Sequence, residues 1–122
     1  LGYVFQDYAL IPELTALDLV FFQDNIGGLS RLATLLDELA EAIDAKKLVS
    51  ATKHYGQITT AQRLGYMLEN VLNYKEKTEP LFAWLKEQKY FPVVLQSGKK
   101  SRNTRTNNRW RIIKNASPQS DL

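Results

Sequence analysis

The chain has 122 residues, of which 44% are hydrophobic and 24% charged, and its formal net charge is +3. It contains no cysteine, which excludes disulfides, thiolate nucleophiles and cysteine-ligated zinc. A run of about 18 apolar residues and a basic-then-apolar leader are both missing, so the sequence predicts a cytoplasmic protein without a membrane span or signal peptide.

A chain of this length supports one hydrophobic core, which buries roughly two-thirds of the unfolded surface. The sequence has no internal repeat, so we expect residues 1–115 to form a single domain and residues 116–122 to be a disordered tail. It begins at Leu1 without an initiator methionine and runs directly into a strand-like segment. We therefore expect an upstream part of the protein.

Pro12 and Glu13 mark the start of the first predicted helix. Proline suits the first turn, where its missing N–H is not needed, and a carboxylate complements the positive end of the helix dipole. Apolar residues then recur at spacings of three and four and predict a buried stripe: Leu14, Leu17 and Phe21. Gly27 and Gly28 interrupt this pattern, because glycine relieves backbone limits and is poor inside a helix, and they predict a turn.

The segment 29–43 has the strongest helical periodicity of the chain. Its apolar residues share one face: Leu29, Leu32, Ala33, Leu35, Leu36, Leu39, Ala40 and Ile43. The opposite face is polar, and we expect its acids to be solvated: Asp37, Glu38, Glu41 and Asp44. These acids do not have the placement of a metal-binding or glycosidase pair.

Two further helices are predicted in the middle of the chain. The first spans 46–55 and closes at Gly56, which suits the left-handed cap position. Thr59 and Gln62 have the spacing of a capping box, which would open the next helix. Gly65 lies on the apolar stripe of that helix, where it costs about 1 kcal/mol relative to alanine. We therefore expect Gly65 to permit the close approach of a neighbouring element.

The last part of the chain combines one helix with strands. Residues 78–80 predict a helix start and the helix should end near Lys89. The predicted strands are Leu1–Tyr8, Tyr90–Leu95 and Arg109–Lys114, the last two antiparallel and joined by a long loop, 96–108. The expected fold class is α+β, a helix-rich domain of four or five helices packed on a small, mainly antiparallel sheet.

No residue pattern predicts a catalytic site, a metal site or a cofactor, and we expect no enzyme. His54 is the only histidine, and alone it makes neither a metal site nor a catalytic triad, so a structural or surface role is favoured. For Asp18, which lies among apolar residues, a structural pairing is favoured over a partner contact. A phosphotransferase or nuclease would need a phosphate-cradling glycine loop or clustered carboxylates for Mg²⁺. Four aromatic residues are expected in the core rather than stacked on bases: Trp84, Tyr90, Phe91 and Trp110.

Positive charge is concentrated in the last part of the chain. Residues 1–74 carry a net charge of −4 and residues 75–122 a net charge of +7. Within residues 99–114, here called the basic segment, seven bases occur without an acid: Lys99, Lys100, Arg102, Arg105, Arg109, Arg111 and Lys114. Such a run is a candidate phosphate-binding surface for nucleic acid, in the form of a basic β-hairpin. A solvated surface is the alternative.

A helix-turn-helix motif is a further interpretation, because residues 48–72 contain two predicted helices around a glycine. The second helix of a DNA-reading motif exposes several long polar side chains at its start. Here only Gln62 and Arg63 qualify, and Leu64 with Gly65 indicates packing instead. Exposure of residues 60–67 would distinguish the two interpretations.

The block PELTALDLVFFQDNIGGLSRLATLLDELAEAI, at 12–43, gives the most specific resemblance. With the lead-in residues 1–5 and the later segments ITTAQRLGYMLE, WLKEQKYFPVVL and NRWRIIKN, it resembles the C-terminal domain of AbiEi-type antitoxins, over nearly all of the chain. One departure is Ile11, where such proteins more usually place a serine or threonine helix cap.

The resemblance implies an antitoxin and transcriptional regulator of a type IV toxin–antitoxin, or abortive infection, system. In that family an N-terminal winged helix-turn-helix domain represses the operon, and the C-terminal domain counteracts a nucleotidyltransferase toxin without a stable complex. The expected partners are operator DNA, bound by the full-length protein, and the cognate toxin. A nucleic-acid-binding module that acts through the basic hairpin is the alternative function.

Overall fold

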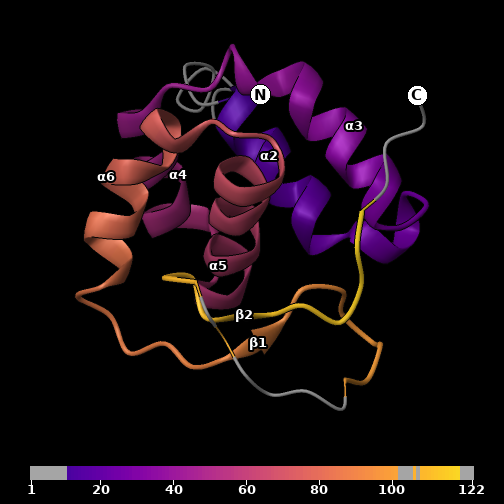
Figure 1. Ribbon diagram of the computed structural model, residues 1–122. Helices are drawn as coiled ribbons and strands as arrows, with labels where there is room; N and C mark the ends of the chain where they lie inside the picture. Colours follow the sequence, from indigo (N-terminus) through magenta and orange to yellow (C-terminus); the bar gives the residue numbers. More distant parts are fainter. Residues whose placement is uncertain (1–10, 102–105, 107, 119–122) are drawn as a thin grey trace.

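The computed structural model describes residues 11–101, 106 and 108–118. Within them, five α-helices enclose a hydrophobic core and two short strands lie at one end of the helices (Figure 1). The α-helices, labelled as in Figure 1, are α2 (Ile11–Phe21), α3 (Leu29–Ala40), α4 (Ala45–Tyr55), α5 (Ile58–Tyr66) and α6 (Lys75–Leu85). This is the expected helix-rich α+β fold. The predicted strand Leu1–Tyr8 lies outside the described residues.

Helix α2 has Pro12 in its first turn, as predicted, but its buried face differs from the predicted stripe. The buried residues are Glu13, Ala16, Leu17 and Val20. Phe21 is half exposed, because the face toward α4 and α5 is filled by the small side chain of Ala16 and by Val20, one turn later. The buried carboxylate of Glu13 accepts a hydrogen bond from Asp44 N–H at 2.8 Å, so it also ties α2 to the start of α4.

The predicted diglycine turn and the amphipathic second helix are both confirmed. Residues Gln23–Asn25 form a 3₁₀ turn, and Gly27 and Gly28 have φ values of 102° and 90° that only glycine adopts easily. Helix α3 then buries Leu29, Leu32, Leu36 and Ala40, while its acids are exposed. It ends at Ala40, three residues earlier than predicted, and Ile43 enters the core from the connection to α4.

Helix α4 closes at Gly56, as predicted, but the predicted left-handed conformation of Gly56 and the predicted capping box of α5 are both wrong. Gly56 ends α4 in an extended conformation, with φ −95° and ψ 175°, rather than in the left-handed region. Helix α5 starts at Ile58 after Gln57, without a side-chain cap. Thr59 and Gln62 do not form a capping box, because Gln62 is fully buried and its amide bonds two distant carbonyl groups instead.

Three residues of α5 hold the C-terminal part of the chain in place. The Nε2 of Gln62 donates to the carbonyls of Phe91, at 2.8 Å, and Trp110, at 2.9 Å. Arg63 Nε donates to Val94 O at 2.9 Å. Gly65 faces the indole of Trp110 so closely that an added Cβ would lie within 3.0 Å of three ring atoms. The predicted close approach at Gly65 is confirmed.

The chain between α5 and α6 contains a π-helical turn, Met67–Val71, closed by a bond from Leu72 N to Met67 O at 3.0 Å. Helix α6 starts at Lys75, a turn before the predicted start, with Pro80 inside it. Tertiary contacts decide this earlier start: Lys77 Nζ donates to Ile43 O at 2.5 Å. The helix ends at Leu85 rather than near Lys89, and three residues of irregular turn follow.

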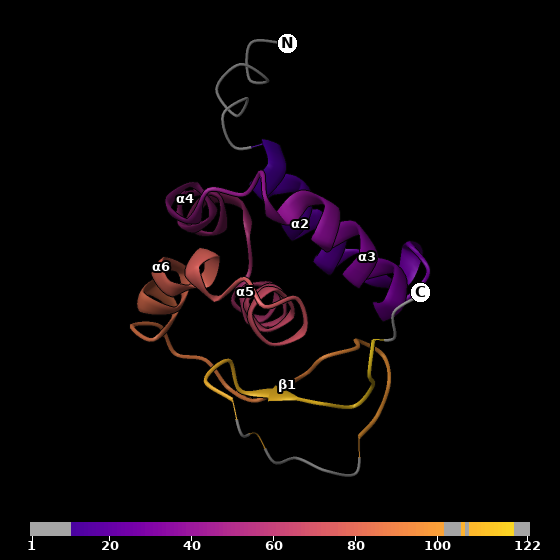
Figure 2. The ribbon, with the colours of Figure 1, turned by 45° about the horizontal axis from the view of Figure 1, so that its top comes forward.

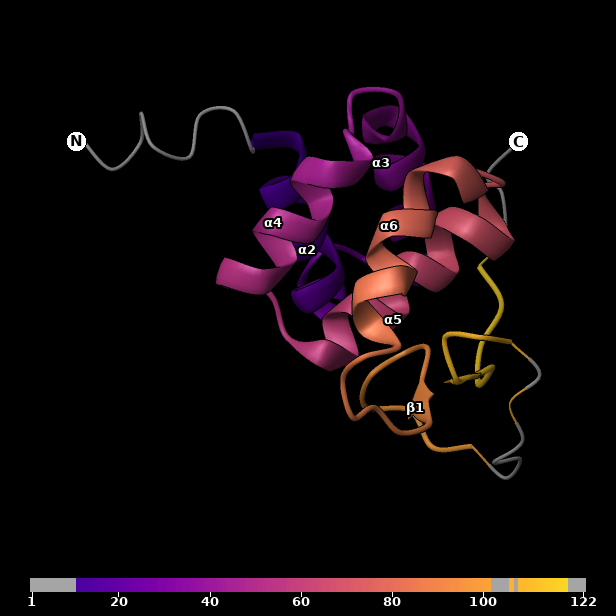
Figure 3. The ribbon, with the colours of Figure 1, turned by 90° about the vertical axis from the view of Figure 1, so that its left-hand side faces the viewer.

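The sheet consists of β1 (Val93–Val94) and β2 (Ile112–Ile113), and the prediction of antiparallel strands is wrong. The strands are parallel, with Val93 opposite Ile112 and Val94 opposite Ile113. They lie at one end of the helices, near α5 (Figures 2 and 3). Both ends of the pair are tied together, since Tyr90 Oη donates to Arg109 O before the strands and Asn115 bonds Gln96 after them. These links align the two strands in the same direction.

We expect Gly65→Ala to lower the free energy of unfolding by about 1–3 kcal/mol, the usual range for an overpacked core. This loss occurs even though alanine improves helix propensity by about 1 kcal/mol. Urea unfolding of both proteins measures it. In a Trp110→Leu background the same change should be neutral or stabilising, because the rigid indole is gone. Equal destabilisation in both backgrounds would contradict the packing explanation.

Candidate nucleic-acid interface

The basic segment does not form a hairpin, because β2, which lies within it, pairs in parallel with β1. The structure describes five of its seven bases, and Arg102 and Arg105 lie outside the described residues. Lys99, Lys100 and Lys114 are exposed. Arg111 is exposed as well, whereas Arg109 is partly buried.

The three exposed lysines lie after the carboxyl ends of the two strands. Lys114 directly follows β2, and the next residue, Asn115, donates from Nδ2 to Lys99 O at 2.7 Å and to Gln96 O at 2.9 Å. The side chain of Asn115 therefore links the segment after β2 to the segment after β1. The fold thus brings together Lys114 and the pair Lys99-Lys100, which are far apart in the sequence.

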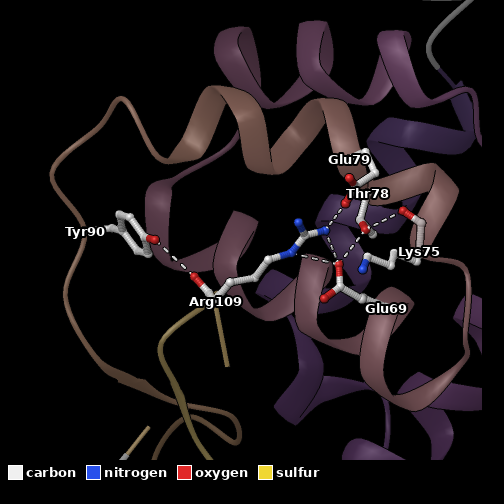
Figure 4. A network of polar contacts seen from close by, with 6 residues as sticks. All are labelled: Glu69, Lys75, Thr78, Glu79, Tyr90 and Arg109. Carbon is white, nitrogen blue, oxygen red and sulfur yellow. Dashed lines mark hydrogen bonds and ion pairs between the residues drawn. The ribbon is translucent and has the colours of Figure 1, made fainter. Parts of the chain in front are cut away.

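Arg109 and Arg111 lie before β2, at the other end of the sheet. Arg109 donates from Nε to Glu69 Oε1 at 3.1 Å, and its Nη2 pairs with Glu69 and with Glu79 (Figure 4). Thr78 Oγ1 donates to the same oxygen of Glu69 at 2.9 Å. The guanidinium carbon also lies 4.4 Å from the ring centroid of Phe82. Arg109 thereby connects the π-helical turn, α6 and the C-terminal segment.

These contacts shift the pKa values of Arg109 and Glu79. Burial opposes the charge of Arg109, but hydrogen bonds from its guanidinium to Glu69 and Glu79 outweigh this effect and raise its pKa. The hydrogen bond from Arg109 lowers the pKa of Glu79 below its ordinary value, against an opposing effect of burial. Two carboxylates thus neutralise Arg109, and its geometry is that of a structural ion pair.

Arg111 has a different environment. Its backbone φ is 55°, a value that residues other than glycine rarely adopt. Nη1 donates to Tyr90 O at 2.6 Å, and the guanidinium carbon lies 4.2 Å from the Tyr90 ring centroid. Neither contact is with an acid, so the side chain keeps its positive charge at the surface.

Two cations that no sequence pattern singled out lie close to Arg111. Lys86 and Lys89, in the turn after α6, line a pocket together with Arg111. Two bases followed by two aromatics in KEQKYF were the available indication, but both lysines suit the end of a helix equally well. Only the position of Arg111 joins them into one site.

The helix-turn-helix interpretation is wrong. Residues 60–67 are buried, apart from the half-buried Arg63. Both long polar side chains at the start of α5, Gln62 and Arg63, bond backbone carbonyls of the C-terminal segment. Burial lowers the pKa of Arg63, with Asp24 opposing the shift. Neither side chain is placed to reach a base edge.

The remaining candidate residues have the following positions. His54 is exposed and bonds Ser50 O through Nδ1 at 2.8 Å, and Asp18 is exposed on α2. Of the aromatics expected in the core, Phe91 is 73% exposed and contradicts that prediction, since its neighbour Pro92 and the bond from Gln62 hold only its backbone.

Among the residues that the structure describes, no group of acids and histidines could hold a metal ion, and no helix is long and apolar enough to cross a membrane.

A helical core with an exposed cationic segment at one end defines a small α+β domain. A family model described as AbiEi antitoxin C-terminal domain matches residues 8–70. The chain belongs to this family, as the resemblance indicates, and the family is one of antitoxins rather than enzymes. The match ends before α6 and the strands, so it is shorter than the expected resemblance. The chain matches no curated protein and no solved structure.

The ion pair of Glu79 predicts a specific pH dependence. A lowered pKa means that the stabilisation by this carboxylate is complete above its ordinary value of 4.5 and is lost as the pH falls through the lowered value. We therefore expect Glu79→Gln to be less stable than wild type by a constant amount between about pH 7 and pH 5, and the difference to vanish in stronger acid. Urea unfolding at each pH measures it.

Glu76→Gln is the matched control, because Glu76 is an exposed acid in the first turn of the same helix. The stability difference between Glu76→Gln and wild type should be smaller than that of Glu79→Gln and should not show the same full dependence on pH. A Glu79→Gln difference that stays constant into strong acid would show that the ion pair with Arg109 is not its source.

Proposed function

We propose that this chain is the effector domain of an antitoxin that counteracts a nucleotidyltransferase toxin without forming a stable complex with it. Membership of the AbiEi antitoxin C-terminal domain family is the observation that carries the proposal. In this proposal a winged helix-turn-helix domain precedes Leu1 in the full-length protein and reads the operator sequence. The chain acts in the cytoplasm as part of an abortive infection system and as a transcriptional regulator.

The second part of the proposal is that the basic segment supports operator binding. Exposed lysines bind phosphates without reading base sequence. Lys99, Lys100 and Lys114 are exposed and lie after the carboxyl ends of the two strands, and Arg102 and Arg105 belong to the same segment of the sequence. No acid among the described residues pairs with Arg111, whereas two acids neutralise Arg109. We assign phosphate contact to six of the seven bases, all except Arg109, and a supporting structural role to Arg109.

An independent nucleic-acid-binding module remains the second candidate function. The observation that favours it is the acid-free charge of the basic segment, seven cations within residues 99–114. Under this hypothesis the chain would bind nucleic acid without the winged helix and would have no effect on the toxin.

Co-expression with the toxin tests the first part. Where a nucleotidyltransferase gene lies beside the gene for this chain, the 122-residue chain should restore growth of cells that express that nucleotidyltransferase. Because the proposal excludes a stable complex, the two proteins should elute separately in size-exclusion chromatography. A folded and expressed chain that gives no rescue would refute the effector role, and co-elution would refute the mode of action.

Charge removal in the full-length antitoxin tests the second part. Each lost phosphate contact should reduce the slope of log affinity against log salt by about 0.9 for duplex DNA. Changing Lys99, Lys100 and Lys114 to Gln should therefore reduce the slope by up to about 2.7 and lower affinity equally for operator and unrelated sequences. Fluorescence anisotropy at several salt concentrations measures both effects.

The matched control removes the same charge from α4, where three lysines are exposed: Lys46, Lys47 and Lys53. Their triple change to Gln should leave the salt slope unaltered. If the two triple variants behave alike, the basic segment makes no phosphate contacts.

A further inference from the structure

The turn after α6 and the residue before β2 form a second feature of the surface. Six residues line a pocket of about 370 Å³ there: Lys86, Gln88, Lys89, Tyr90, Phe91 and Arg111. Three of them are cations, and no described lining residue is an acid. Glu87 belongs to the same turn but does not line the pocket. This set is here called the aromatic–basic pocket.

Phe91 is the unusual member of the pocket. It is 73% exposed, more than any other large hydrophobic residue in the described part of the chain. Its backbone is nevertheless held, because its carbonyl accepts a bond from the buried Gln62 and Pro92 restricts the conformation of the preceding residue. The structure therefore presents an apolar ring to solvent from a fixed backbone position.

The cations of the pocket are placed for an anion. Arg111 is oriented by Tyr90, whose carbonyl takes one of its five N–H donors and whose ring lies against the guanidinium. Its backbone has a positive φ, and such conformations concentrate at ligand-binding positions. Lys86 and Lys89 are exposed beside it. A phosphate in the pocket would meet three positive charges.

We propose that the aromatic–basic pocket binds an unpaired nucleotide, with its base stacked on Phe91 and its phosphate held by Lys86, Lys89 and Arg111. A ring beside cations is the combination that binds single-stranded nucleic acid, because every base has a face that stacks on an aromatic side chain. The pocket volume is within the range of small-ligand sites. This activity goes beyond phosphate contact with operator DNA, since the bases of a duplex are stacked inside it and do not reach Phe91.

Stacking is tested by substitutions at Phe91, with a single-stranded oligonucleotide that contains 2-aminopurine and with ATP as probes. Phe91→Leu should weaken binding of the 122-residue chain about fivefold or more, the lower end of the effect of one stacked base. Phe91→Trp should retain binding, and nucleotides should quench its fluorescence. Phe22→Leu is the control, because Phe22 is half exposed but lines another pocket.

The phosphate contact is tested with the same strand at several salt concentrations. Changing Lys86 and Lys89 together to Gln should reduce the salt slope by up to about 0.7, the value for one phosphate of a single strand. Lys46→Gln and Lys53→Gln, which remove equal charge from α4, should leave the slope unchanged.

Three results would overturn the proposal: no binding of either probe, competition by inorganic triphosphate as strong as by ATP, or an equal effect of Phe91→Leu on a blunt duplex. The second result would mean an anion site without base recognition. Binding of ATP and the strand, or of the strand alone, supports the proposal and identifies the source of the nucleotide. Because these assays contain neither toxin nor operator, their failure would leave the antitoxin role unaffected.

Discussion

The contact between Gly65 and Trp110 determines how the C-terminal part of the chain is attached. The indole of Trp110 is fully buried and occupies the space that a side chain at position 65 would need. Only a residue without a Cβ permits this arrangement in a helix, at a cost of about 1 kcal/mol in helix propensity. Burial of a tryptophan side chain offsets that cost, since it removes 150–250 Å² of aromatic surface from water.

Polar contacts from α5 then orient the two strands relative to this buried tryptophan. Gln62 reaches the carbonyls of Phe91 and Trp110, so one buried side chain binds the segments before β1 and before β2. Arg63 bonds the β1 carbonyl of Val94. Since helix α5 bonds both segments at their starts, the two strands leave it in the same direction, which accounts for their parallel pairing.

The family match and the cations occupy different parts of the chain. Residues 8–70 belong to the matched region, which includes α2 to α5 and the residues that anchor the C-terminal segment. Helix α6, both strands and the two cationic surfaces lie beyond it. The matched helices therefore act as a support, and the surfaces that we propose for phosphates and unpaired nucleotides are carried by the attached segment.

Charge alone does not define those surfaces. Arg109 belongs to the same basic segment as Lys99, yet two carboxylates from outside that segment neutralise it. Conversely, Lys86 and Lys89 lie outside the basic segment and become part of a site only through Arg111. A count of bases along the sequence therefore includes one structural ion pair and misses one cationic pocket.

Local sequence patterns correctly predicted those structural features whose physical cause lies in neighbouring residues. The amphipathic period of α3, the turn at Gly27 and Gly28 and the proline in the first turn of α2 depend on neighbouring residues, and all three are confirmed. Gly65 was also interpretable, because a glycine on an apolar helix face is unfavourable without a packing reason.

Tertiary structure decided the features whose causes are distant in the sequence. Gln62 has the spacing of a capping box. Its buried amide instead donates hydrogen bonds to the carbonyls of Phe91 and Trp110 and does not cap the start of its own helix. The direction of β2 depends on bonds between segments about twenty residues apart, from Tyr90 to Arg109 and from Gln96 to Asn115. Sequence determined which segments are helical and where charge is concentrated, whereas only the packed structure decided which charges are paired, because ion pairs and strand register depend on contacts that no local pattern specifies.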